Sequence, residues 1–132
     1  MFRSIPLLIL VVIPYFAIVF TAPTAIDARI LGFTLPSGAA WSLTVGGLLQ
    51  VFGLVLIYLE ILKSVRTSMA SMIDHGLSLM LFTLCLILFI VVPKAGTSTF
   101  FLILVMTALD VVAGFTVTLA ASRRSVGVEP GL

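Results

Sequence analysis

The residues of this chain that could do chemistry are polar side chains inside long apolar runs. Asp110 lies at the centre of the run from 99 to 121. A carboxylate at that depth of a membrane costs about 2.5–3.5 kcal/mol on insertion scales, so it needs a partner or a purpose. Gln50, Tyr15 and Thr83 have similar positions in three other runs, and a rise of about 1.5 Å per residue brings all four near one level. These four residues form a candidate midplane polar site.

Two interpretations of this midplane site stay open. In the first, Asp110 is neutral or hydrogen-bonded to Gln50 or Tyr15, and it fixes the register of the helices. In the second, Asp110 binds a proton, a cation or a polar substrate during transport, which is the usual role of an acid inside a membrane. We favour the structural interpretation because no basic residue is expected at the same depth.

A second group of charged side chains falls near the ends of the second and third apolar runs. Glu60 and Lys63 are three residues apart, and Asp74 is near a predicted helix start, where the helix dipole favours an anion. We expect a solvated ion network at the cytoplasmic edge of the membrane, with a gate or docking site as the alternative. Its members are Glu60, Lys63, Arg66, Asp74 and His75.

Enzymatic and cofactor chemistry has no signature in the sequence. There is no nucleophile elbow, phosphate-binding glycine loop, paired-cysteine motif or close pair of acids. His75 is the only histidine, so one chain cannot hold haem b between two histidines, and Cys85 is the only cysteine. We therefore expect no catalytic residues, no cofactor and no metal site.

Long apolar helices are the elements that position these residues. The chain has 132 residues, of which 61% are hydrophobic and 9% charged. A soluble domain carries about 25% charged residues, so lipid is the expected solvent. A membrane span needs about 20 mostly apolar residues, which predicts helices at about 5–21, 39–62, 73–92 and 99–121. The predicted fold is all-α: one integral membrane four-helix bundle over residues 1–132.

Helix ends and helix faces follow from local signals. Ser37 should precede the second helix, Ser71 with Asp74 should cap the third, and Thr97 or Ser98 should cap the fourth, after Pro93 ends the third. The connection from 22 to 38 should lie on the outer leaflet as a short interfacial segment rather than form a ligand lid. Small and polar residues form a stripe on each of two helices, and both stripes should face protein. The stripes are Ser42, Gly46, Gln50, Gly53, Ile57, Glu60 and Ser64, and Thr107, Asp110, Gly114, Thr118 and Ala121.

Basic residues predict the orientation of the chain in the membrane. Five fall on one side and two on the other, which places both termini in the cytoplasm. Because the net charge is only +2 and these residues are scattered, nucleic acid is not an expected partner. The two groups are Arg3, Lys63, Arg66, Arg123 and Arg124, and Arg29 and Lys94.

The layout from Leu35 to Arg124 carries a resemblance, most clearly in three stretches: TLPSGAAWSLTVGG, MIDHGLSLMLF and TSTFFLILVMTALDVVAGF. They look like small, uncharacterised four-span proteins of the bacterial inner membrane, which implies a multi-pass protein of the inner (plasma) membrane. More loosely, LPSGAAWSLTVGGLLQVFG followed by a basic turn is similar to the small four-helix subunit of tripartite tricarboxylate transporters.

These observations together predict a non-enzymatic structural or accessory subunit of a membrane complex, or a homo-oligomer. Its expected partners are the lipid bilayer and either a second copy or a larger membrane protein. The alternative is a minimal proton- or cation-coupled transporter or channel that uses Asp110.

Overall fold

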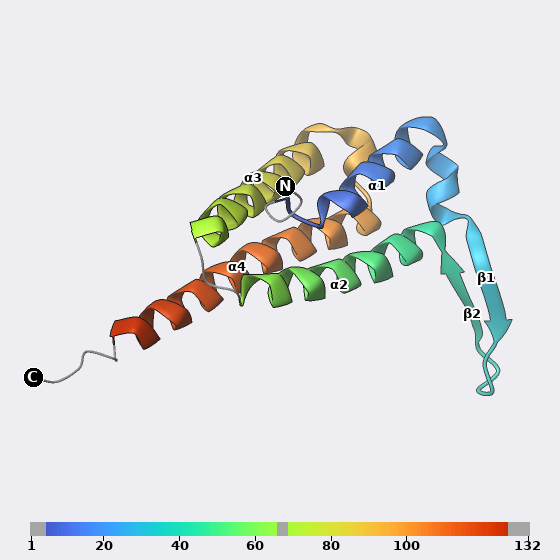
Figure 1. The fold of residues 1–132 in the computed structure, drawn as a ribbon. Helices are drawn as coiled ribbons and strands as arrows, with labels where there is room; N and C mark the ends of the chain where they lie inside the picture. The colour runs from blue at the N-terminus through green and yellow to red at the C-terminus, as the bar shows by residue number, and fades with distance from the viewer. Residues whose placement is uncertain (1–4, 66–68, 127–132) are drawn as a thin grey trace, which may run out of the picture.

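The computed structural model describes residues 5–65 and 69–126, with the backbone alone at 69–71 and 125–126. Arg3 and Arg66 lie outside the described residues. Within them the chain forms four α-helices, two short 3-10 helices and one two-stranded antiparallel sheet (Figure 1). The elements are α1 (Ile9–Thr21), η2 (Pro23–Asp27), β1 (Arg29–Thr34), β2 (Ala40–Thr44), α2 (Val45–Ser64), α3 (Met69–Val91), η3 (Pro93–Ala95) and α4 (Ser98–Val126).

Three of the helices are long and apolar enough to cross a membrane, as the sequence predicts. They are Val45–Ser64, Met72–Val91 and Ser98–Arg124. The remaining helix, α1, has 13 residues and a length of about 20 Å, less than the roughly 30 Å of a bilayer core. The fourth span therefore stays a prediction.

Helix α4 is the central element, and both α2 and α3 pack against it (Figure 1). Close approach of α2 to α4 depends on glycines: a Cβ on Gly46 would lie 2.7 Å from Thr99 Oγ1, and one on Gly53 would lie 2.6 Å from Met106 Sδ. From the first of these contacts to the second, the residue numbers rise by seven on both helices, so α2 and α4 run parallel. For the stripe on α2, the prediction that it faces protein is confirmed at these two glycines.

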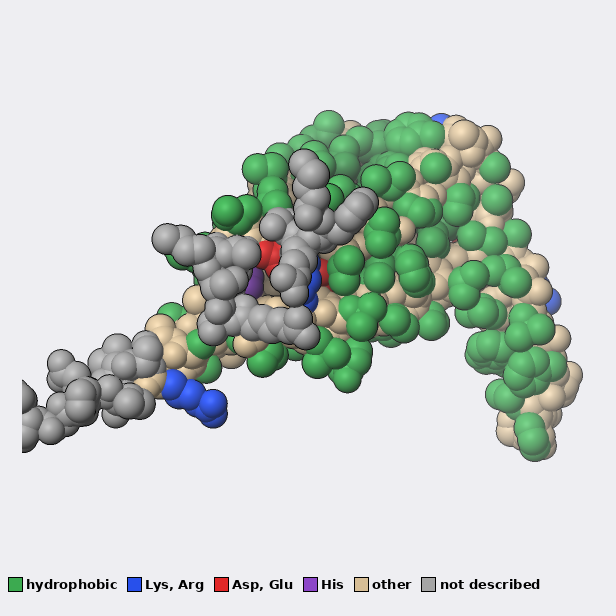
Figure 2. Space-filling view, in the orientation of Figure 1, with side chains coloured by type: hydrophobic (Ala, Val, Ile, Leu, Met, Phe, Trp, Pro, Cys, Tyr) green, Lys and Arg blue, Asp and Glu red, His purple; other side chains and the backbone are tan. Residues whose placement is uncertain are grey.

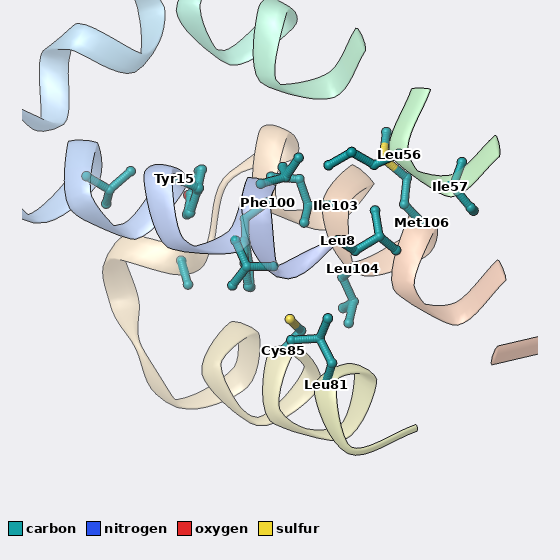
Figure 3. Packing of buried hydrophobic residues seen from close by; sticks show 14 of the residues in the cluster. Leu8, Tyr15, Leu56, Ile57, Leu81, Cys85, Phe100, Ile103, Leu104 and Met106 are labelled. Atoms are coloured by element: carbon teal, nitrogen blue, oxygen red, sulfur yellow. The ribbon is translucent and has the colours of Figure 1, made fainter. Parts of the chain in front are cut away.

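The hydrophobic core lies where α1 packs onto the other helices. Figure 3 shows Leu8, Tyr15, Leu56, Cys85 and Phe100 converging from the four helices. The rings of Tyr15 and Phe100 are stacked with centroids 4.9 Å apart, and neither side chain is exposed. This aromatic pair fixes the short α1 against the start of α4.

The prediction of an all-α fold is wrong between residues 29 and 44, where the chain forms a β-hairpin. Leu31 pairs with Leu43 and Phe33 with Trp41, and Gly38 has a φ of 83° in the connecting turn. Because Ala40–Thr44 has no charged residue and leads directly into the apolar residues of α2, composition assigns it to the helix, yet its backbone pairs with Arg29–Thr34 in the extended conformation.

Helix α2 consequently begins at Val45 rather than near residue 39. Its N-cap is Thr44, whose Oγ1 accepts a hydrogen bond from Gly47 N at 3.1 Å, and not Ser37. The capping box at Ser71 and Asp74 is also wrong, because α3 already begins at Met69. Capping of α4 by Thr97 is confirmed: its Oγ1 accepts a hydrogen bond from Phe100 N at 3.1 Å.

Candidate functional site

A buried ion cluster centred on Lys63 lies near the C-terminal end of α2. The Lys63 ammonium is 2.8 Å from Glu60 Oε1 and 3.2 Å from Asp74 Oδ1 on α3. It also donates a hydrogen bond to the carbonyl oxygen of Ile5 at 3.3 Å. The contacts to Glu60 and Asp74 are ion pairs, and the contact to Ile5 is a hydrogen bond.

Glu60 connects the cluster to the segment that leads into α1. Its Oε2 accepts a hydrogen bond from the backbone N–H of Leu7 at 3.0 Å. Glu60 is 3% exposed and Asp74 is 7% exposed, whereas the sequence predicts a solvated network at headgroup level. The burial is due to a tertiary contact: the segment that leads into α1 lies over the end of α2. The sequence patterns of α2 and α3 alone do not indicate that this segment covers them.

Asp110 belongs to the same region of the protein. It is 6% exposed, its carboxyl group interacts with the Ser78 side chain on α3, and it is within electrostatic range of Lys63, Glu60 and Asp74. Figure 2 shows acidic, basic and histidine side chains gathered at one end of a mostly hydrophobic surface. Sequence reasoning missed Ser78, although it falls four residues after Asp74 and therefore on the same face of α3.

His75 connects α3 to α4 beside the cluster. Its Nε2 is 2.8 Å from Thr118 Oγ1, and its ring lies over Gly114, where a Cβ would be 2.5 Å from Nδ1. The ring also stacks on Phe115 with centroids 6.3 Å apart. His75 therefore packs between the helices at a position where α4 has no side chain.

The structure does not bring Gln50 together with Asp110. Because Gly46 meets Thr99 and Gly53 meets Met106, Asp110 comes level with Ile57. Gln50 lies seven residues earlier on α2, or about 10 Å away along the axis. The predicted common level depended on a helix that begins near residue 39, and the hairpin moves that start by six residues.

Tyr15 and Thr83 also lie apart from Asp110. The Tyr15 hydroxyl is 2.5 Å from Thr97 Oγ1 and donates a hydrogen bond to the carbonyl oxygen of Lys94 at 3.3 Å, at the start of α4. Thr83 is exposed, and its hydroxyl donates a hydrogen bond to the Leu79 carbonyl oxygen of its own helix at 2.9 Å. These side chains satisfy local polar groups instead of forming one site.

Two kinds of chemistry are open to the ion cluster. Its ion pairs and hydrogen bonds can hold α1, α2, α3 and α4 together, and its carboxyl groups can bind or release a proton. Across residues 5–65 and 69–126, no group of three or more His, Cys, Asp or Glu side chains is placed to hold a metal ion. Comparison with protein-family models, curated proteins and solved structures finds no match to this chain.

Proposed function

We propose that the chain is a non-enzymatic, multi-pass protein of the bacterial inner membrane, with both termini in the cytoplasm. In this proposal it is a small structural or accessory subunit that assembles with itself or with a larger membrane protein. The observation that carries the proposal is an open groove on the outer face of α3, away from the core of the bundle.

That outer face is a shallow apolar groove along α3. Its residues recur at three- and four-residue steps, so they share one side of the helix. At Gly76 the groove is open, since an added Cβ would meet nothing within 4 Å. Small residues allow membrane helices to approach closely, so Gly76 is suited to a helix–helix contact. The groove is lined by Gly76, Leu79, Met80, Thr83, Leu84 and Ile87.

The ion cluster supports a structural role for the bundle. Lys63, Glu60 and Asp74 bind the lead into α1, the end of α2 and the start of α3 to one another. Breaking a buried ion pair by removing one partner is costly, so these contacts favour one arrangement of the three segments. A bundle held together in this way, with an open apolar face, is a suitable scaffold for assembly.

A larger side chain at Gly76 tests whether the groove takes part in assembly. Gly76→Leu should abolish oligomers or co-purification with a partner, because the side chain fills the groove without disturbing the interior of the bundle. The measurement is native mass spectrometry after extraction in mild detergent. Ala120→Leu, which adds bulk at an exposed position of α4, is the matched control and should assemble normally. Equal assembly of both variants would remove the groove as a docking surface.

A second candidate function is proton- or cation-coupled transport through Asp110. The observation in its favour is Asp110, a residue only 6% exposed, whose carboxyl group lies beside Ser78 and within range of Glu60 and Asp74 and could exchange a proton between helices. Asp110→Asn keeps the size and hydrogen-bonding capacity of the side chain, so the protein should fold normally in either case.

A measurement of proton or cation flux distinguishes the two candidate functions, an assembly subunit and a transporter. In proteoliposomes, a transporter should lose its proton- or cation-dependent flux on Asp110→Asn, while the scaffold should show no flux before or after the substitution. Asp110→Leu should cost about 1–3 kcal/mol of stability because it leaves Ser78 without its carboxyl partner. Wild-type flux that survives in the Asn variant would exclude Asp110 as the transport site.

A further inference from the structure

The β-hairpin of β1 and β2 has one apolar face. Leu31 pairs with Leu43 and Phe33 with Trp41, so these four side chains lie on the same side of the sheet and are called the aromatic face below. The rings of Phe33 and Trp41 are 5.1 Å apart between centroids. The pairs on the other side, Gly32 with Ser42 and Thr34 with Ala40, carry small or hydroxyl side chains. From Leu31 to Leu43 the hairpin is therefore amphipathic, while Ile30, at the β-bulge between Arg29 and Leu31, adds a further exposed apolar side chain.

Three of the four side chains of the aromatic face are exposed, and the fourth, Leu43, is half-buried beside Gly47 at the start of α2. Leu31 is 54% exposed, Phe33 52% and Trp41 41%. Figure 2 shows hydrophobic side chains over the hairpin, which projects away from the helices. A contiguous exposed apolar face of this kind marks a surface that contacts something other than water.

The direction of the hairpin indicates what covers it. Thr44, the last residue of β2, is followed directly by Val45, the first residue of the membrane-crossing α2. Figure 1 shows the two strands running crosswise to α2 instead of extending its axis. When α2 crosses a bilayer, a crosswise hairpin at its end lies along the membrane surface.

Backbone hydrogen bonding sets the depth of the hairpin. A two-stranded sheet has two open edges, whose unpaired N–H and C=O groups cannot be left in hydrocarbon. At the headgroup level, water and lipid oxygens satisfy those edges while aromatic rings reach the acyl chains. From residue 28 to residue 59, Arg29 is the only charged residue, so the hairpin carries no acid that would repel anionic lipid.

We propose that the hairpin lies flat in the lipid interface of the membrane that α2 crosses, with its aromatic face toward the acyl chains. The occupant of this face is lipid rather than a protein chain. The inference rests on the proposed membrane location. It adds a second mode of lipid contact, through a β-hairpin, to that of the helices.

The native Trp41 tests the proposal, because it is the only tryptophan in the chain. The full-length protein is reconstituted in phosphatidylcholine–phosphatidylglycerol vesicles, and flotation with the vesicles is measured first, so that membrane location is judged separately. Tryptophan emission is then measured with lipids brominated near the headgroup end of the acyl chain, and with iodide on both sides of the membrane. We expect the lipid quencher to reduce the emission strongly and iodide to reduce it little.

A matched variant moves the tryptophan by one residue to the other face. Trp41→Phe combined with Ala40→Trp places the indole at an exposed position on the small and hydroxyl face. In that variant iodide quenching should rise and lipid quenching should fall. Iodide access at position 41 would overturn the proposal. Protection of Trp41 from both quenchers would overturn it too, because a protein surface would then cover the face, and so would identical quenching at positions 40 and 41.

Discussion

Lys63 is the residue that decides the stability of the charged end of the bundle. One ammonium group is within 3.3 Å of oxygens from Glu60, Asp74 and Ile5, and two of those oxygens belong to buried carboxyl groups. The Lys63 side chain itself is 23% exposed, but removing it leaves two buried carboxylates uncompensated, and that costs far more than the intact pairs contribute.

Lys63→Met should therefore destabilise the protein by about 3–5 kcal/mol, the cost typical of breaking a buried ion pair. Unfolding of the purified protein in detergent, followed by circular dichroism, measures the change. Lys94→Met is the matched control. Lys94 is exposed and lies 5.1 Å from the centroid of the Phe20 ring, a contact worth about 0.5–1 kcal/mol. Similar losses in the two variants would mean that the cluster around Lys63 is solvated.

For Asp110, the need for a partner could be predicted from the sequence, but the identity of the partner could not. The sequence identifies it as a side chain that needs a partner, because an acid within a long apolar run is costly. It does not identify Ser78 or Lys63 as that partner. Counting residues from the end of a helix gives the depth of a side chain in the membrane only when the helix boundaries are right. It does not tell which face of the helix the side chain lies on. An error of six residues at the start of α2 was enough to bring Gln50 to the level of Asp110 in the prediction.

At the scale of elements, glycines set how closely the helices approach. At Gly114 of α4 an added Cβ would lie 2.5 Å from Nδ1 and 2.7 Å from Cε1 of His75. The imidazole ring is rigid, so it must move as a whole and lose its contact with Thr118, now 2.8 Å.

Gly114→Ala should therefore cost about 1–3 kcal/mol, the usual range for an overpacked interior. Gly76→Ala on the outer face of α3 is the control. Its Cβ meets nothing within 4 Å, so the higher helix propensity of alanine should stabilise α3 by up to about 1 kcal/mol. Both changes are measured on the detergent-solubilised monomer by thermal unfolding. Neutral behaviour of Gly114→Ala would show that α3 and α4 are free to separate at this level.

The elements themselves were predictable to different degrees. The third and fourth helices follow from composition, and Thr97 as the cap of α4 follows from local chemistry. The hairpin does not follow from composition or local chemistry. Ala40–Thr44 is assigned to the beginning of a membrane span unless its pairing with Arg29–Thr34 is known. Strand pairing is non-local information. A sliding window that measures only hydrophobicity does not distinguish a paired strand from the first turn of the membrane helix that follows it, so it assigns both to the helix.

At the scale of the whole molecule, the parallel arrangement of α2 and α4 sorts the basic residues by end. Lys63 lies at the C-terminal end of α2, and Arg123 and Arg124 lie in the last turns of α4, at the same end. Arg29 precedes the start of α2 and Lys94 precedes the start of α4, at the opposite end. The positive-inside rule then favours a cytoplasmic location for the end that carries three of these five residues.

The hairpin turn and the C-terminus are separated by three helices, each long enough to cross a membrane. An odd number of crossings places the two points on opposite sides, whether or not the short α1 also crosses. A periplasm-dependent reporter inserted after Pro36 should therefore be active, and the same reporter fused after Leu132 should be inactive. A fluorescent protein that matures only in the cytoplasm should report the reverse at these two positions. Fused ahead of Met1, it should be fluorescent if α1 crosses as well. The opposite pattern would invert the orientation, and equal signals at Pro36 and Leu132 would show that fewer than three helices cross.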